Sequence, residues 1–118
     1  MPDRDLTVTL RPHPAGPCLL EVAGELDHHT ADRMRQALNE LPRDRGTAVV
    51  IDLSGLVYCD SSGITVLITA YHLTQAVGGS LALAGLDDDI MRVFGIVGLD
   101  QIFDFYGSVE EAVAALTG

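Results

Sequence analysis

The chain has 118 residues, of which 47% are hydrophobic and 20% charged, and its formal net charge is −10. This length favours one domain over residues 1–118 with a single core, and the composition excludes a disordered chain. The negative charge argues against nucleic acid and anionic membranes as partners, because both would repel the protein. No segment is apolar and long enough to span a bilayer, and residues 1–5 lack the apolar core of a signal peptide, so a cytoplasmic location is expected.

The N-terminal third predicts a hairpin followed by a helix. Residues 6–10 alternate between apolar and polar, which is typical of a half-buried strand, and residues 18–23 predict a second strand. The prolines and the glycine between them indicate a short connection and therefore an antiparallel pair. The segment 24–29 breaks this pattern, and Thr30 is a candidate N-cap for a helix that ends at Pro42.

The middle of the chain predicts a buried strand and then a helix. Residues 48–53 form a continuous, β-branched apolar run between two glycines, which is typical of a strand buried on both faces. Residues 56–59 form a second short apolar piece. Residues 64–77 are long enough for about four turns of helix and stop at a pair of glycines.

The predicted helix at 64–77 has an unusual surface, because it has no Asp, Glu, Lys or Arg and His72 is its only residue that could carry a charge near neutral pH. A surface helix normally has a charged face, so this one is either buried on all sides or partly covered by a partner. A domain of this size has limited room to bury a helix completely. We therefore expect a partner-binding surface here, with Ile64 and Leu67 of one apolar face as candidate contacts.

The C-terminal third predicts alternating strands and helices. Its predicted elements are a strand at 80–84, a helix after the aspartates at 87–89, an edge strand at 101–104 and a last helix with a capping box of Ser108 and Glu111. In the first of these helices Ile90, Val93 and Phe94 should face inward. The three aspartates carry the charge typical of a helix N-terminus. The whole pattern predicts an α/β fold with a mixed sheet of four to five strands and about four helices.

The quartet Asp60-Ser61-Ser62-Gly63 lies at the corner between the central strand and the uncharged helix. Asp60 or Ser61 can accept hydrogen bonds from the free N–H groups at the start of that helix. The same N–H groups and the helix dipole favour negative charge, so a phosphate or another anion would be stabilised there. The quartet is therefore either a cap alone or a cap beside a serine that is modified or binds an anion.

An enzyme that uses Ser61 as its nucleophile lacks supporting residues. Cys59 stands where a nucleophile elbow has glycine, and His72 lies about three helical turns away. The chain has no lysine, which excludes a P-loop. Cys18 and Cys59 lack metal-ligand spacing, and His28-His29 has no second pair of ligands. No enzymatic activity, metal or cofactor is expected.

Two motifs in this order resemble the STAS domain of the bacterial anti-sigma factor antagonists that act in sporulation and stress response. The first is GELDHHT at 24–30, and the second runs from Asp52-Leu53-Ser54 to Asp60-Ser61-Ser62-Gly63. The resemblance covers essentially the whole chain. It implies a partner-switching protein whose unphosphorylated form binds an anti-sigma factor and so releases a sigma factor.

The resemblance also implies roles for residues and partners. The anti-sigma factor is a serine kinase of the GHKL ATPase type that phosphorylates the position of Ser61, and a metal-dependent serine phosphatase reverses the reaction. The candidate neighbours of this phosphorylation site in partner binding are Asp27, His28, Thr30, Asp60, Ser62, Gly63, Ile64 and Leu67. The alternative is a ligand-sensing STAS module that binds a nucleotide or a small anion at the helix N-terminus next to Ser61.

Overall fold

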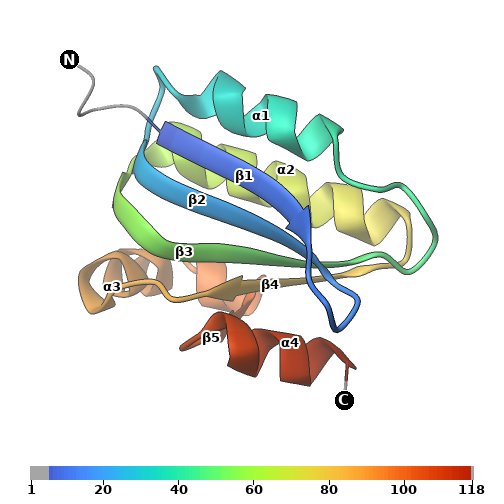
Figure 1. Cartoon of the computed structure of the whole chain (residues 1–118). Helices are drawn as coiled ribbons and strands as arrows, with labels where there is room; N and C mark the ends of the chain where they lie inside the picture. The colour runs from blue at the N-terminus through green and yellow to red at the C-terminus, as the bar shows by residue number, and fades with distance from the viewer. Residues whose placement is uncertain (1–5, 118) are drawn as a thin grey trace.

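The computed structural model describes residues 6–117, in which strands and helices alternate after an N-terminal hairpin (Figure 1). The strands are β1 (Leu6–Pro12), β2 (Cys18–Leu26), β3 (Ala48–Cys59), β4 (Ser80–Ala84) and β5 (Asp104–Tyr106). The helices are α1 (Ala31–Asn39), α2 (Ser61–Ala76), α3 (Asp88–Ile96), the short 3-10 helix η2 (Leu99–Gln101) and α4 (Val109–Thr117). The predicted fold class is confirmed.

The strands form one sheet in the order β1-β2-β3-β4-β5. β1 is antiparallel to β2, whereas β2, β3, β4 and β5 run parallel to one another. Parallel neighbours end at the same edge of a sheet. The segments that follow β2, β3 and β4 therefore start at one end of the molecule, and the candidate site is built there.

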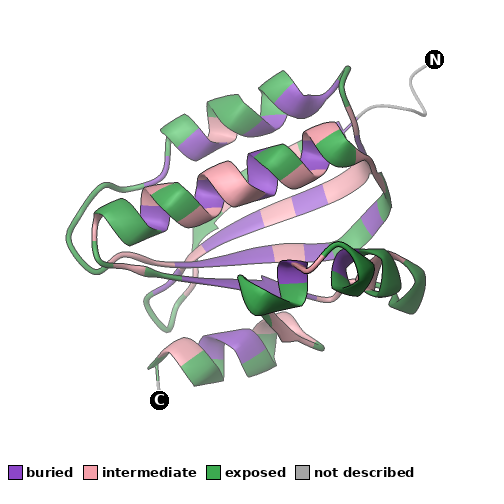
Figure 2. Ribbon diagram, turned by 180° about the vertical axis from the view of Figure 1, so that it is seen from behind, coloured by how far each residue is buried: buried purple, intermediate pink, exposed green. Residues whose placement is uncertain are grey.

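Helices cover both faces of the sheet, with α1 and α2 on one face and α4 on the other (Figures 1 and 2). The larger core lies under α1 and α2 and includes Leu20, Ile51 and Phe94, none of which is exposed. A smaller core on the other face joins Val50 to Ala112 of α4. The central strand is buried on both faces because both cores use its side chains, as its continuous apolar run predicts.

The central strand β3 is longer than expected, since Gly55 does not interrupt it. A Cβ atom at Gly55 would lie 2.7 Å from the Cβ of Ala23. The glycine therefore allows β3 to pass close to β2, where the register between the two strands shifts. The apolar piece at 56–59 belongs to the same strand and extends it beyond the buried part of the sheet.

Two predictions in the C-terminal third are wrong. The expected edge strand at 101–104 is instead η2 followed by β5, because Gly98 has a φ of 84° and turns the chain there. Val93 of α3 does not face inward and is 48% exposed, whereas Phe94 is fully buried. A helix of nine residues that packs at the edge of the sheet has one narrow buried stripe, and Phe94 occupies it.

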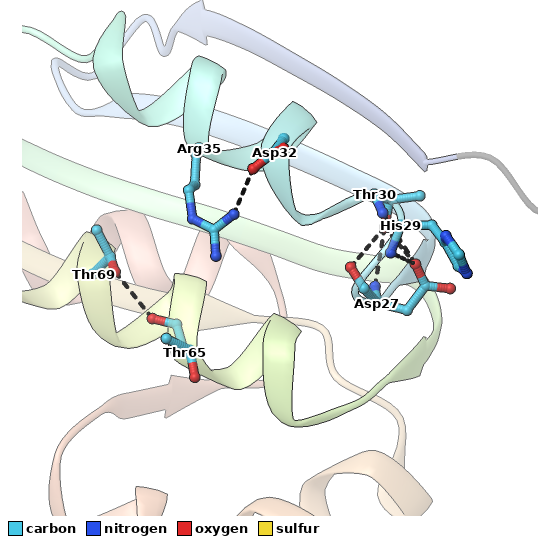
Figure 3. A network of polar contacts seen from close by, with 7 residues as sticks. All are labelled: Asp27, His29, Thr30, Asp32, Arg35, Thr65 and Thr69. Carbon is cyan, nitrogen blue, oxygen red and sulfur yellow. Dashed lines mark hydrogen bonds and ion pairs between the residues drawn. The ribbon is translucent and has the colours of Figure 1, made fainter.

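The uncharged helix α2 is buried on one side only (Figure 2). Its solvent side carries hydroxyl-bearing residues such as Ser61 and Thr65 in place of acidic and basic ones. The hydroxyl of Thr65 donates to the Ser61 carbonyl oxygen at 2.9 Å. The hydroxyl of Thr69 donates to the Thr65 carbonyl oxygen at 3.1 Å (Figure 3). Because these hydroxyls bond within the helix, the exposed side of α2 is easier to desolvate than a charged one.

Candidate functional site

The ends of β2 and β3 are joined directly at the candidate site. The backbone N–H of Asp60 donates to the Leu26 carbonyl oxygen at 3.2 Å, so the residue before Ser61 is hydrogen-bonded to the residue before Asp27. Gly63 makes this junction possible, because a Cβ there would lie 2.8 Å from both Cγ and the carbonyl oxygen of Leu26. The two sequence motifs that were far apart in the chain therefore form one surface.

Of the two candidate caps, Asp60 and Ser61, it is Asp60 that caps helix α2. One oxygen of its carboxylate accepts hydrogen bonds from the N–H groups of Ser62 at 2.9 Å and Gly63 at 3.1 Å. Its own carbonyl oxygen accepts the N–H of Ile64 at 3.0 Å, which closes the first helical turn. Two of the N–H groups that could have held an outside anion, those of Ser62 and Gly63, are thus already bound to a carboxylate.

The loop between β2 and α1 is held by Asp27 and Thr30 (Figure 3). A carboxylate oxygen of Asp27 accepts the N–H groups of His29 at 2.9 Å and Thr30 at 3.1 Å. The Thr30 hydroxyl donates to the Glu25 carbonyl oxygen at 2.7 Å and accepts the N–H of Asp27 at 3.0 Å. Thr30 is the N-cap residue of α1, as the sequence predicts, but its side chain makes no hydrogen bond to that helix.

These bonds affect the acidity of Asp27. Partial desolvation alone would raise its pKa, but the hydrogen bonds from Thr30 and His29 and the nearby charge of His29 outweigh it and lower the pKa. Asp27 therefore stays ionised to lower pH than an ordinary aspartate, and its carboxylate carries a negative charge at any physiological pH.

A hollow of about 420 Å³ separates the two loops. It is lined by Glu25, Asp27, His28, His29, Tyr58 and Asp60. The imidazole rings of His28 and His29 meet edge to face, with their centroids 4.6 Å apart. The lining has three carboxylates and no arginine, which makes this hollow acidic and disfavours a small anion or a nucleotide as its ligand.

The predicted site residues differ in how accessible they are. Ser61 and His28 are exposed, and Asp27, Asp60, Ser62 and Ile64 are half-buried. Leu67 is fully buried in the larger core, so the prediction of Leu67 as a partner contact is wrong. In α2 the Leu67 side chain faces the sheet, whereas Ile64 lies about one turn nearer the N-terminal end of the helix. Thr30 and Gly63 are also buried and shape the site from within.

The chemistry available to Ser61 is limited. Among residues 6–117, no hydrogen bond joins the Ser61 hydroxyl to an imidazole or a carboxylate, so nothing positions a base on it. No cluster of three or more potential metal ligands occurs within the described range. The hydroxyl is accessible to another protein that brings its own catalytic groups.

The sequence analysis missed several exposed apolar side chains at this end of the molecule. Val57 and Tyr58, near the end of β3, are 68% and 49% exposed. On α3, which begins after the end of β4, Val93 and Ile96 are also exposed, with Ile96 at 77%, and so is Val97 directly after this helix. Residues 56–59 are all apolar, so no alternation marks Val57 as exposed, and the short helix α3 gives no such signal either.

Comparison with known proteins shows the family. The STAS domain matches residues 9–112. An anti-sigma F factor antagonist from Paenibacillus polymyxa is 31% identical over 88% of this chain and 90% of its own length. An anti-sigma-B factor antagonist from Listeria monocytogenes is 36% identical over 70% of this chain and 73% of its own. The chain belongs to the STAS-domain family.

The fold agrees with this assignment. The crystal structure of an anti-sigma factor antagonist from Mycobacterium paratuberculosis superposes with a TM-score of 0.82 at 28% identity. That match covers 100% of this chain and 98% of the other. Within residues 6–117, none of the helices has the length and apolar character needed to cross a membrane.

Proposed function

We propose that this protein is an anti-sigma factor antagonist whose partner binding is switched off by phosphorylation of Ser61. The observation that carries the proposal is the position of Ser61, exposed in the first turn of α2 beside the acidic hollow. The curated relatives named above as anti-sigma factor antagonists support it. In the unphosphorylated state the protein binds an anti-sigma factor, which then releases its sigma factor.

Phosphorylation changes the surface without disturbing the fold. Within the described residues the Ser61 hydroxyl takes part in no hydrogen bond, so a phosphoryl group replaces no interaction. The N-terminal position on α2 tolerates negative charge. The added charge of about −1.5 to −2 lies next to Asp60 and near Asp27, where no arginine lines the hollow. Burying it against a partner is expected to weaken binding roughly a hundredfold or more.

The partner surface extends beyond the hollow. Tyr58 lines the hollow and is half exposed, and the exposed apolar residues of α3 follow β4 at the same end of the sheet. Apolar and aromatic side chains at the centre of a polar rim are typical of a protein interface. The anti-sigma factor is proposed to be a serine kinase of the GHKL ATPase type, and a metal-dependent serine phosphatase is proposed to reverse its action.

The test combines modification and binding. Intact-mass spectrometry and peptide mapping of the protein from its native cells should find one phosphoryl group on Ser61 that phosphatase treatment removes. When tagged Ser61→Ala is used for affinity capture from an extract of those cells, it should bind a protein that contains a GHKL ATPase domain and binds a sigma factor. Ser61→Asp should not bind this protein. Ser62→Ala, the matched control one residue away, should still bind it.

Two results contradict the proposal. Undiminished phosphorylation of Ser61→Ala would move the modification to another residue. Equal affinity of Ser61→Ala and Ser61→Asp for the purified anti-sigma factor in titration calorimetry would show that charge at this position does not control binding. Saturable binding of a nucleotide without any kinase would favour the ligand-sensing alternative, against which the occupied N–H groups of Ser62 and Gly63 argue.

A further inference from the structure

The outer edge of β1 has hydrogen-bonding groups with no partner. At the hairpin the N–H of His13 donates to the Pro17 carbonyl oxygen at 2.8 Å. Counting back along the antiparallel register, Arg11, Thr9 and Thr7 bond to β2, so the N–H and C=O groups of Val8 and Leu10 point away from the sheet. Within residues 6–117, those outward groups of Val8 and Leu10 have no hydrogen-bond partner.

This edge lacks the usual protection. Natural proteins protect exposed strands with charge, proline, bulges or short length. The opposite edge strand, β5, has only three residues. In contrast, β1 has seven residues and no charged side chain before Arg11. Of the outward-facing residues within 6–117, Leu6 is already engaged, because the Arg33 guanidinium donates to its carbonyl oxygen.

The sequence of this edge is symmetric. Residues 6–10 are Leu-Thr-Val-Thr-Leu, which is the same in both directions. In an antiparallel pair centred on Val8, each Val8 lies opposite its copy, Leu6 opposite Leu10, and Thr7 opposite Thr9. The residues whose N–H and C=O groups face outward, Leu6, Val8 and Leu10, then meet only one another, so the hydrogen-bond ladder is complete.

We propose that β1 is a self-association edge, through which two copies of this chain form a twofold-symmetric dimer with one continuous ten-stranded sheet. A twofold interface must be self-complementary. The edge of β1 is self-complementary both in its hydrogen-bonding groups and in its side chains, so a second copy of the chain fits it. No carboxylate lies on β1, although the chain carries a net charge of −10. Two copies that meet through β1 therefore bring no carboxylates of this strand together, in spite of the net negative charge of each copy.

The proposed dimer has a defined geometry. Thr7 and Thr9 form cross-strand pairs on the face away from α1 and α2, while the apolar residues extend the larger core across the join. The Arg33 guanidinium can remain, because the Leu6 carbonyl oxygen has a second lone pair for the new bond. Since the two strands run in opposite directions, the two Ser61 corners lie at opposite ends of the sheet and both stay open to partners.

The first test follows amide exchange by NMR while the protein concentration is raised. The amides of Val8 and Leu10 should become protected as sedimentation shows a dimer forming. Those of Thr7 and Thr9 already bond to β2, so they serve as internal controls and should change little. Sedimentation of a monomer alone at millimolar concentration, or a dimer in which Val8 and Leu10 still exchange freely, would overturn the proposal.

The second test compares two double variants that differ only at residue 7. In Thr7→Lys/Thr9→Lys each lysine faces a lysine of the other copy, so dimer affinity should fall at least about tenfold. In Thr7→Glu/Thr9→Lys the same positions pair opposite charges, and the dimer should persist. Thr7 lies opposite Ala23 within the monomer, so this choice leaves the internal pairing of β1 with β2 unchanged.

The comparison separates a specific edge from general association. The doubly lysine-substituted protein is the less acidic one, so non-specific attraction would make it associate more strongly, the reverse of the expected order. Equal affinities of the two variants would reject the Val8-centred register. Loss of the dimer in Ile96→Ser with both threonines intact would assign self-association to α3 instead.

Discussion

The backbone N–H of Asp60 donates a hydrogen bond to the carbonyl oxygen of Leu26 at 3.2 Å, and this bond brings two distant loops together. Asp60 precedes the proposed phosphorylation site, and Leu26 precedes the aspartate of the first motif. The space around this bond is filled, since Gly63 lies against both Leu26 and Cys59. The following predictions depend on this junction and on the residues around it.

Gly63→Ala should destabilise the protein by about 1–3 kcal/mol, because the added Cβ would lie 2.7 Å from the Cys59 sulfur and 2.8 Å from the Leu26 carbonyl oxygen. Urea unfolding measures the effect. Gly95→Ala is the matched control, since nothing lies within 4 Å of its Cβ position and it should stabilise α3 by about 0.5 kcal/mol. Equal stabilities of the two variants would contradict the close packing at Gly63.

Asp60→Ala should lower the free energy of unfolding by about 1 kcal/mol, because the N–H groups of Ser62 and Gly63 lose their acceptor. Asp60→Asn keeps an acceptor oxygen and should retain most of the stability. Asp87→Ala, which removes the corresponding cap of α3, is a suitable comparison. If Asp60→Asn is as unstable as Asp60→Ala, the charge and not the hydrogen bonds matters.

The Cys59 thiol should be inert at pH 8. Burial, and then the nearby charge of Asp60, raise its pKa to about 12, which leaves about one molecule in 10⁴ as the reactive thiolate. In Cys18→Ser, where Cys59 is the only thiol, a disulfide reagent should react quickly only after unfolding. Cys59→Ser, which keeps the more exposed Cys18, should react faster. Rapid labelling of native Cys18→Ser would show that the junction opens often.

The carboxylate of Asp27 should titrate below the ordinary pKa of an aspartate, as followed by NMR. A folded-state pKa that is lowered contributes stability above the unfolded-state pKa, and that contribution is lost as pH falls through the folded-state pKa. Asp27→Asn should therefore unfold with a weaker dependence on pH across the acid range. Unaltered acid unfolding of this variant would mean that the loop opens before Asp27 titrates.

Ile96→Ser should weaken binding to the anti-sigma factor at least about tenfold while leaving the unfolding midpoint nearly unchanged, because this side chain is 77% exposed. Calorimetric titration with the purified anti-sigma factor measures this affinity. Ala115→Ser on α4, an exposed substitution on the opposite face of the sheet, is the control. Full affinity of Ile96→Ser would restrict the interface to the hollow and α2.

Much of the fold and part of the site could be predicted from local sequence. Three features depend only on residues close together in the sequence. They are the alternation of residues 6–10, the apolar run in β3 and the cap formed by Asp60. For the same reason the proposed phosphorylation site could be placed at a helix N-terminus before the tertiary structure was known. Local hydrogen bonding and hydrophobic periodicity determine such features.

Other features depended on packing between distant segments. Gly55 lies within β3, where its missing side chain leaves space for Ala23 of β2. Thr30 is the N-cap residue of α1, but its hydroxyl donates to the Glu25 carbonyl oxygen and makes no bond to the helix. The burial of Leu67 and the exposure of Val93 follow from which side of each helix meets the sheet.

The sequence by itself therefore determined the order of strands and helices and the chemical type of the corner at Ser61. Only the tertiary structure decided which residues share that corner. The parallel alignment of β2 with β3 brings Asp27 and Asp60 to opposite sides of one hollow. The physical reason is that helix caps and apolar periodicity act over a few residues, whereas strand register and burial are set by contacts between segments far apart in the chain.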